Sequence, residues 1–317
     1  MESRQTREAR IAMVVALLWS RASASMGNIN IYWGQNSNEA SLPNTYASGN
    51  FEIVMLAFLN KFADGQTPVL NLAGHCDPPS GGCKSLSADI QSCQSRGVKV
   101  FMSLGGAVRN YKITSVEDAK NMASYLWDNF LGGQSDSRPI GDAVQDGIDF
   151  NIQNTTAHWD DLASAMSALS TPSKKIYLSA APQCPYPDAH LITALQTGRF
   201  DYVWIQFYNN TPCLYANDNA TNLVNSWTLW TTSIPTAQTR SFYIGLPAAP
   251  DAINNGGYVE PDVLISQVLP KIKPSSKYGG VMLWSKYWDE QTNYSSIIKD
   301  SIITKPSLVE VPSLAYV

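Results

Sequence analysis

An α/β fold consisting of a single (β/α)8 TIM barrel is predicted by eight short apolar runs that alternate with helical patterns along the 317-residue chain. Several runs are apolar nearly throughout, which is typical of parallel strands covered on both faces. A doubly wound open sheet would require a glycine-rich phosphate-binding loop after its first strand, whereas the first run ends in Trp33-Gly34-Gln35. The expected strands are residues 29–33, 53–59, 98–104, 147–152, 176–181, 202–207, 242–246 and 281–284.

Helix signals lie between the expected strands. Ser115-Val-Glu-Asp118 resembles a capping box, and the apolar residues that follow keep helical spacing until Gly132-Gly133. A further helix is expected over residues 262–273, with Pro261 at its start and a distorted last turn at Pro270. The longest insertion, residues 60–84, follows the second strand.

Composition excludes several classes of protein. Hydrophobic residues make up 44% of the chain and charged residues 15%, which supports a large packed core and excludes a disordered chain. The formal net charge is −4 and no basic run is present, so no nucleic-acid partner is expected.

Both ends of the chain are expected to lie outside the barrel. In residues 1–25, three arginines precede an apolar run and small residues follow it, which is typical of a secretory signal peptide. That run is too short to span a bilayer and no later stretch is long and apolar enough, so no membrane partner is expected. The barrel would then occupy residues 26–303 of a secreted or vacuolar protein. Residues 304–317 would be either a removable propeptide or an irregular terminus.

Cysteine usage agrees with an oxidising compartment. Cys76 and Cys83 enclose a tight Pro/Gly loop that suits a local disulfide, and Cys184 and Cys213 each lie beside a proline in loops where a second disulfide is expected. Cys93 lies on the apolar face of an expected helix and is predicted to be a buried free thiol. Candidate glycosylation sequons occur at Asn154, Asn209, Asn219 and Asn293.

Polar side chains at the carboxyl ends of the expected strands indicate a binding site, because barrels of this type carry their functional residues there. Alternation along the fourth strand places Asp149, Asn151 and Gln153 on one face that points into the barrel. Such a row of buried polar groups is costly unless it forms a site. Phenol, indole and amide groups on other strands describe a sugar-binding cleft: Tyr32, Trp33, Gln206, Tyr208, Asn209 and Trp284.

Seven segments resemble the plant class III chitinases of glycoside hydrolase family 18, in that family's order and over about residues 27–302. They are Ile31-Tyr-Trp-Gly-Gln35, Ala57-Phe-Leu-Asn-Lys-Phe62, Ser103-Leu-Gly-Gly106, Asp146-Gly-Ile-Asp149, Ser179-Ala-Ala-Pro-Gln-Cys184, Gln206-Phe-Tyr-Asn-Asn210 and Gly279-Gly-Val-Met-Leu-Trp-Ser285. The resemblance implies a TIM barrel, a groove for polymers of N-acetylglucosamine, and hydrolysis assisted by the acetamide of the substrate. It also implies the same two disulfides and places Tyr46 where the family has the partner of Cys93.

The chain departs from the family's catalytic motif, Asp-Gly-x-Asp-x-Asp-x-Glu. Gln153 stands in the position of the glutamate that protonates the leaving oxygen, Asn151 in that of the aspartate that orients the N-acetyl group, and Asp149 alone keeps its carboxylate. An amide does not titrate, and acid–base catalysis contributes about 10²–10⁴ in rate. These residues predict a protein that is not an enzyme and has no catalytic residue.

The resemblance assigns binding roles to residues that were singled out above. Trp284 would lie under a sugar ring, Tyr208 and Gln206 would bind the acetamide, Tyr32 would line the subsite, and Asn209 would belong to the same site. Ordinary barrel packing is the alternative for Tyr32, Tyr208 and Trp284. Ala107 stands where the family commonly has a third glycine after the third strand, and Val108 and Arg109 follow it. Their added bulk would narrow the cleft, and Arg109 would reach across it.

Four functions compete at this point. The first is a lectin for N-acetylglucosamine or chito-oligosaccharides, like the chitinase-like seed lectins. The second is an inhibitor of microbial glycosidases, like the related xylanase inhibitor proteins. The third is seed storage, concanavalin B being a further relative, and the fourth is an active enzyme, which the motif opposes. No cofactor is expected, and His75, His158 and His190 lack metal-ligand spacing, so no metal is expected either.

Overall fold

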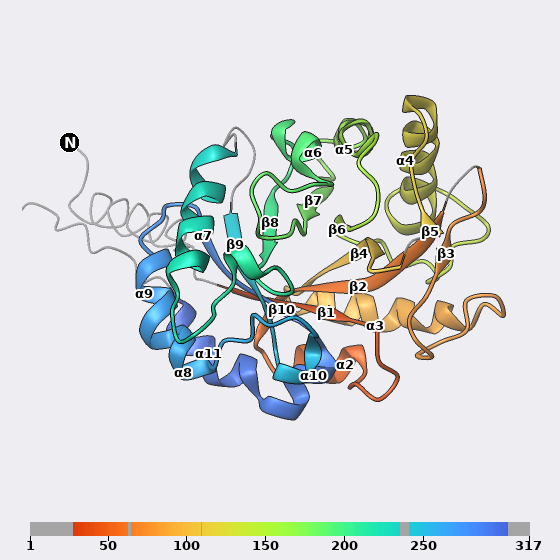
Figure 1. Ribbon diagram of the computed structural model, residues 1–317. Coiled ribbons are helices and arrows are strands. Elements are labelled where there is room, and N and C mark those ends of the chain that lie inside the picture. Colours follow the sequence, from red (N-terminus) through yellow and green to blue (C-terminus); the bar gives the residue numbers. More distant parts are fainter. Residues whose placement is uncertain (1–27, 63–64, 109, 235–240, 304–317) are drawn as a thin grey trace, which may run out of the picture.

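The computed structural model describes residues 28–62, 65–108, 110–234 and 241–303. The predicted signal peptide, the predicted tail and Arg109 lie outside these residues. Eight parallel strands pair in the order β1-β10-β9-β8-β7-β6-β4-β2, and pairing between β1 and β2 closes the sheet (Figure 1). The predicted (β/α)8 barrel is therefore confirmed.

All eight predicted apolar runs form strands of this barrel. They are β1 (Asn28–Trp33), β2 (Phe51–Phe62), β4 (Lys99–Gly106), β6 (Gly147–Ile152), β7 (Tyr177–Ala180), β8 (Tyr202–Gln206), β9 (Ser241–Pro247) and β10 (Tyr278–Trp284).

Two short strands were not predicted. They are β3 (Val69–Leu70), antiparallel to β2, and β5 (Asn110–Tyr111), parallel to β2. Both pair with the carboxyl end of β2, which at 12 residues is longer than its neighbours in the barrel. Two residues are too few to show an alternating pattern, so the sequence held no signal for them.

Helices cover the outside of the barrel (Figure 1). They are α2 (Leu42–Ala47), α3 (Leu86–Ser95), α4 (Val116–Phe130), α5 (Trp159–Ala168), α6 (Ile192–Gln196), α7 (Thr221–Ser233), α8 (Pro261–Val263), α9 (Leu269–Ile272), α10 (Lys286–Thr292) and α11 (Tyr294–Ile302). The predicted cap of α4 is present, since Ser115 Oγ accepts a hydrogen bond from the Asp118 backbone N–H at 3.1 Å. The returning bond of the box differs, because the Asp118 carboxylate accepts from the Thr114 N–H instead. Within the described ranges, no helix is both long enough and apolar enough to cross a membrane.

The helix expected over residues 262–273 is distorted earlier than predicted. A π-helical turn, η4 (Leu264–Val268), separates α8 from α9, whereas the last turn around Pro270 is α-helical. Proline has no N–H to donate to the carbonyl of the preceding turn, so the hydrogen-bond register widens on the amino-terminal side of Pro270.

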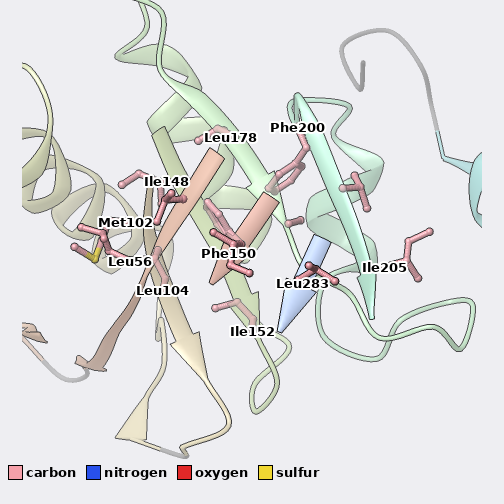
Figure 2. Close-up of a cluster of buried hydrophobic side chains, with 14 of the residues drawn as sticks. Leu56, Met102, Leu104, Ile148, Phe150, Ile152, Leu178, Phe200, Ile205 and Leu283 are labelled. Carbon is pink, nitrogen blue, oxygen red and sulfur yellow. The ribbon is translucent and has the colours of Figure 1, made fainter. Parts of the chain in front are cut away.

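Alternation along the strands divides the core into two layers. Outward-facing residues pack against the helices in a largely aliphatic layer, and Figure 2 shows part of it, including Leu56, Ile148 and Phe150. Inward-facing residues fill the barrel with a cluster rich in aromatic rings, among them Tyr32, Phe58, Phe101, Tyr202, Trp204 and Tyr243. Because Ile148 and Phe150 face outward, Asp149 and Asn151 must face into the barrel.

The cysteine predictions are confirmed. Disulfides join Cys76 to Cys83 and Cys184 to Cys213, and Cys93 is free and buried. Burial raises the pKa of the Cys93 thiol to about 12, which keeps it protonated and unreactive at neutral pH. Tyr46 packs in the same core, and its hydroxyl hydrogen-bonds to Ser92, the neighbour of Cys93.

The two disulfides are expected to contribute unequally to stability. They close loops with sequence separations of 7 and 29 residues, and the longer loop restricts the unfolded chain more. The pair Cys184→Ala and Cys213→Ala should lower the free energy of unfolding by about 3.5 kcal/mol, against about 2.4 kcal/mol for Cys76→Ala and Cys83→Ala. Urea unfolding of both double variants checks this, and a larger loss from the shorter loop would contradict it.

Candidate functional site

A pocket of about 350 Å³ opens at the carboxyl ends of the barrel strands. Three of its seventeen lining residues are aromatic, namely Phe58, Tyr208 and Trp284, and none of these described lining residues is charged. Nine are amides: Gln35, Asn60, Asn151, Gln153, Gln183, Gln206, Asn209, Asn210 and Asn254. The pocket is therefore suited to an uncharged ligand that has many hydrogen-bonding groups.

Most of the residues that were predicted to form the site lie together in this pocket. The strand ends supply Asn151 and Gln153 after β6, Gln206 and the following residues after β8, and Trp284 at the end of β10. Ala107 and Val108, which were expected to narrow the cleft, also line it.

Tyr32 and Trp33 do not line the pocket. Trp33 is buried in the outer layer of the core, and the prediction that Tyr32 lines the subsite is wrong. Its side chain is completely buried, and its hydroxyl donates a hydrogen bond to Asp149 at 2.8 Å. Its ring centroid lies 5.4 Å from that of Trp284, which lines the pocket in its place. Tyr32 thus acts as a support for the site.

Asp149 is also buried beneath the pocket and does not line it. Its carboxylate accepts four hydrogen bonds, from the hydroxyls of Tyr32, Ser103 and Ser179 and from the indole N–H of Trp204, at 2.6–2.8 Å. Burial raises the pKa of Asp149, and the four donors act in the opposite direction by stabilising its charged form. The carboxylate therefore ties β6 to four other strands of the barrel, β1, β4, β7 and β8.

The two amides that follow Asp149 are hydrogen-bonded to each other. Gln153 Nε2 donates to Asn151 Oδ1 at 2.8 Å, which leaves the carbonyl oxygen of Gln153 as an acceptor. The Tyr111 hydroxyl fixes this segment, because it accepts from the Gln153 backbone N–H and donates to the Gly106 carbonyl.

The residues after β8 have different roles. Gln206 Nε2 donates to the Ala181 carbonyl, so its Oε1 is the atom available to a ligand. Burial and the nearby Asp149 raise the pKa of Tyr208, whose hydroxyl therefore remains a hydrogen-bond donor. Asn209 Oδ1 accepts from the Asn255 backbone N–H at 3.0 Å, so this side chain holds the neighbouring rim loop in place.

The aromatic floor of the pocket, formed by Phe58 and Trp284, depends on a glycine in β4. The rings of Phe58 and Trp284 are stacked with centroids 5.9 Å apart. Gly106 has a φ of +83°, and a Cβ at this position would lie 2.9 Å from the Phe58 ring. Only glycine allows both this backbone conformation and this close approach.

Several pocket residues were not assigned to the site from the sequence. Gln35, Asn60 and Gln183 each follow an expected strand within two residues, and this position is the signal that could have identified them. Gln35 Nε2 donates to the carbonyl of Ala57, and the backbone N–H of Gln183 donates to Asp188 at 2.9 Å. Phe58 and Asn254 had no comparable signal.

Two of the three histidines pair with carboxylates. His75 Nε2 lies 3.0 Å from Glu39 Oε1, and His158 Nδ1 lies 2.8 Å from Asp161 Oδ2. Among the residues that the structure describes, no three His, Cys, Asp or Glu side chains form a group that could hold a metal ion.

Comparison with known proteins identifies the family. Residues 28–303 match the model of the glycosyl hydrolases family 18. The chain belongs to this family. An acidic endochitinase of Arabidopsis thaliana is 57% identical over 282 residues, which cover 89% of this chain and 92% of that protein.

Solved structures of the family share the barrel. The ICChI chitinase from Ipomoea carnea has a TM-score of 0.83 and 50% identity, covering 87% of this chain and 100% of its own. A xylanase and alpha-amylase inhibitor protein from Scadoxus multiflorus has a TM-score of 0.80 and 41% identity, covering 86% and 97%. A tamarind chitinase-like lectin has a TM-score of 0.74 and 33% identity, covering 86% and 99%.

These family 18 relatives correct the prediction that the chain is not an enzyme. Relatives that are 50–57% identical over most of the chain are named acidic endochitinases, which points to an enzyme. The prediction that the chain is not an enzyme was based on two side chains, Asn151 and Gln153. An amide at positions 151 and 153 establishes only that these two groups do not titrate, and it does not establish that no other group supplies a proton.

Proposed function

We propose that the protein recognises N-acetylglucosamine units of chitin-type oligosaccharides in the pocket at the carboxyl end of the barrel. The observation that carries this proposal is the lining, with nine amides and three aromatic rings and no charged side chain among the described residues. A neutral sugar offers hydroxyl and acetamide groups to the amides and an apolar ring face to an indole. A charged ligand would find no opposite charge on this lining.

The geometry suggests how the sugar would be held. Trp284 would lie under one sugar ring, because its indole is partly exposed in the pocket and supported from below by Phe58 and Tyr32. The Tyr208 hydroxyl and the Gln206 Oε1 atom offer one donor and one acceptor, which match the carbonyl and the N–H of an acetamide. The tamarind chitinase-like lectin supports recognition as a function within this fold.

Hydrolysis of the bound oligosaccharide is the second candidate function. It is favoured by the 50–57% identity to proteins named acidic endochitinases. Recognition does not depend on turnover, so the two functions are measured separately on the same protein. A secreted or vacuolar location is proposed as well, and it is supported by the two disulfides.

Isothermal titration calorimetry with chitotetraose tests recognition, with cellotetraose as the control that lacks acetamide groups. A saturating heat with chitotetraose and a much smaller one with cellotetraose is the expected result. Heat that continues at a constant rate would reveal hydrolysis in addition. No heat at millimolar chitotetraose would overturn the proposal and make fungal xylanase the next titrant.

Trp284→Ala is expected to weaken chitotetraose binding about 10–100-fold, because a buried aromatic contact of this kind is worth about 1.4–2.8 kcal/mol. Trp284→Phe keeps an aromatic face and should lose less. Leu229→Ala, at an exposed position on α7, is the control and should bind like the wild type. Unchanged affinity in a folded Trp284→Ala variant would show that the sugar binds elsewhere.

A further inference from the structure

A second hollow lies beside the pocket and contains the side chain of Asn154, the residue after Gln153. Its volume is about 490 Å³, and its other lining residues are Lys61, Gln66, Asn110, Tyr111, Lys112 and Thr155. The wall of this hollow is thus mostly amide, ammonium and hydroxyl groups around one aromatic ring. These groups suit the hydroxyls and the acetamide of a sugar.

Asn154 begins an acceptor sequon, Asn154-Thr155-Thr156, and Thr156 is exposed. The Asn154 side chain has no hydrogen-bond partner in the described part of the chain. Its Nδ2 atom is therefore free to carry a substituent.

A second observation, the unpaired hydroxyl of Thr155, also favours a sugar in the hollow. Its Oγ1 atom is buried and has no hydrogen-bond partner among the described residues, although Thr155 lines the hollow. A buried hydroxyl without a partner is unfavourable unless a bound group supplies one. Because Oγ1 is covered in this conformation, a sugar in the hollow would become its partner once the Thr155 side chain rotates about its Cα–Cβ bond.

We propose that Asn154 carries an N-linked glycan whose first N-acetylglucosamine occupies this hollow. The bond that forms joins Nδ2 of Asn154 to C1 of the sugar. The bond that breaks joins C1 to the diphosphate of a lipid-linked oligosaccharide donor, the diphosphate leaves with the bonding electrons, and the amide loses one proton. The two disulfides agree with passage through the oxidising compartment in which such donors are used.

The position gives the glycan a place next to the proposed sugar pocket. The hollow shares Lys61 and Asn110 with a depression along β2, and this depression shares Asn60 and Val108 with the pocket. The glycan would therefore stand at one end of a row of three adjoining hollows. Its attachment and its packing do not depend on the proposed function of the pocket.

Peptide mass spectrometry of the full chain, secreted from plant cells together with a known glycoprotein, tests the attachment. We expect a glycopeptide that contains Asn154 in the wild type and in Thr156→Ser, which keeps the sequon. We expect loss of that single glycan in Thr156→Ala. An unmodified Asn154 beside a normally modified companion glycoprotein would overturn the proposal.

Release by a peptide amidase tests whether the first sugar lies in the hollow. We expect the Asn154 glycan to resist release from the native protein and to be removed after denaturation, because the hollow covers the bond that the amidase cleaves. Equally rapid release from native and denatured protein would overturn the assignment of the sugar to the hollow.

Discussion

Replacing Gln153→Glu together with Asn151→Asp is expected to raise the rate of chito-oligosaccharide hydrolysis by about 10²–10⁴-fold. An amide at position 153 cannot give up a proton to a leaving oxygen, whereas a carboxyl group can. The side chains at positions 151 and 153 are 2.8 Å apart, so two carboxyl groups there would share a proton. This sharing raises the pKa of one of them and keeps it protonated as an acid. Release of reducing ends from chitotetraose measures the change.

The two single variants are the controls for this experiment. Gln153→Glu alone should recover part of the rate, because it supplies the acid without its neighbour, and Asn151→Asp alone should recover little. Calorimetry with chitotetraose on each variant separates altered binding from altered chemistry. A folded double variant that is no faster than the wild type would show that the two amides do not limit the reaction.

Replacing Asp149→Ala is expected to lower the free energy of unfolding by about 3–5 kcal/mol. The substitution leaves four buried donors without an acceptor, namely the hydroxyls of Tyr32, Ser103 and Ser179 and the indole N–H of Trp204. An unsatisfied buried donor costs about 1–3 kcal/mol, and partial rearrangement reduces the sum. Urea unfolding measures the loss.

Ser179→Ala is the matched control, because it removes one donor and leaves the acceptor with three. Its expected cost is about 1 kcal/mol. A loss as small as this in Asp149→Ala would show that the carboxylate does not organise the barrel interior.

The same carboxylate predicts a pH dependence of stability. Burial raises the pKa of Asp149 in the folded protein above its ordinary value of 3.8, which holds in the unfolded chain. Between the unfolded and the folded pKa, the folded protein therefore binds more protons than the unfolded chain. The contribution of Asp149 to the free energy of unfolding therefore falls as the pH rises through this window. Asp149→Asn lacks the titrating group, so its stability curve should diverge from that of the wild type above about pH 4. Parallel curves would contradict the raised pKa.

The candidate site shows which part of a barrel can be predicted from its sequence. Alternation along β6 correctly placed Asp149 and Asn151 inside the barrel, because successive side chains of a strand point to opposite faces. The same rule placed Tyr32 inside, but alternation specifies the face of a strand and not the depth along the barrel axis. The depth is set by how the inner rings stack, and here the ring of Trp284 lies in the pocket while Tyr32 is covered.

The functional prediction failed for a related reason. The absence of activity was inferred from the side chains at two positions alone, Asn151 and Gln153. These two amides do not titrate, and that part of the inference is correct. Activity belongs to the whole site, and the strong similarity of the chain to acidic endochitinases corrects a conclusion drawn from two positions.

The sequence by itself determined the eight barrel strands, the capped start of α4, both disulfides and the buried Cys93, because each depends on local periodicity, capping or the spacing of like residues. The tertiary structure alone decided the short strands β3 and β5, the position of the π-helical turn, the burial of Tyr32 and the pocket residues Phe58 and Asn254. These features depend on which segments meet at the end of the barrel and on how their side chains fill the shared space, and residues far apart in the sequence determine both.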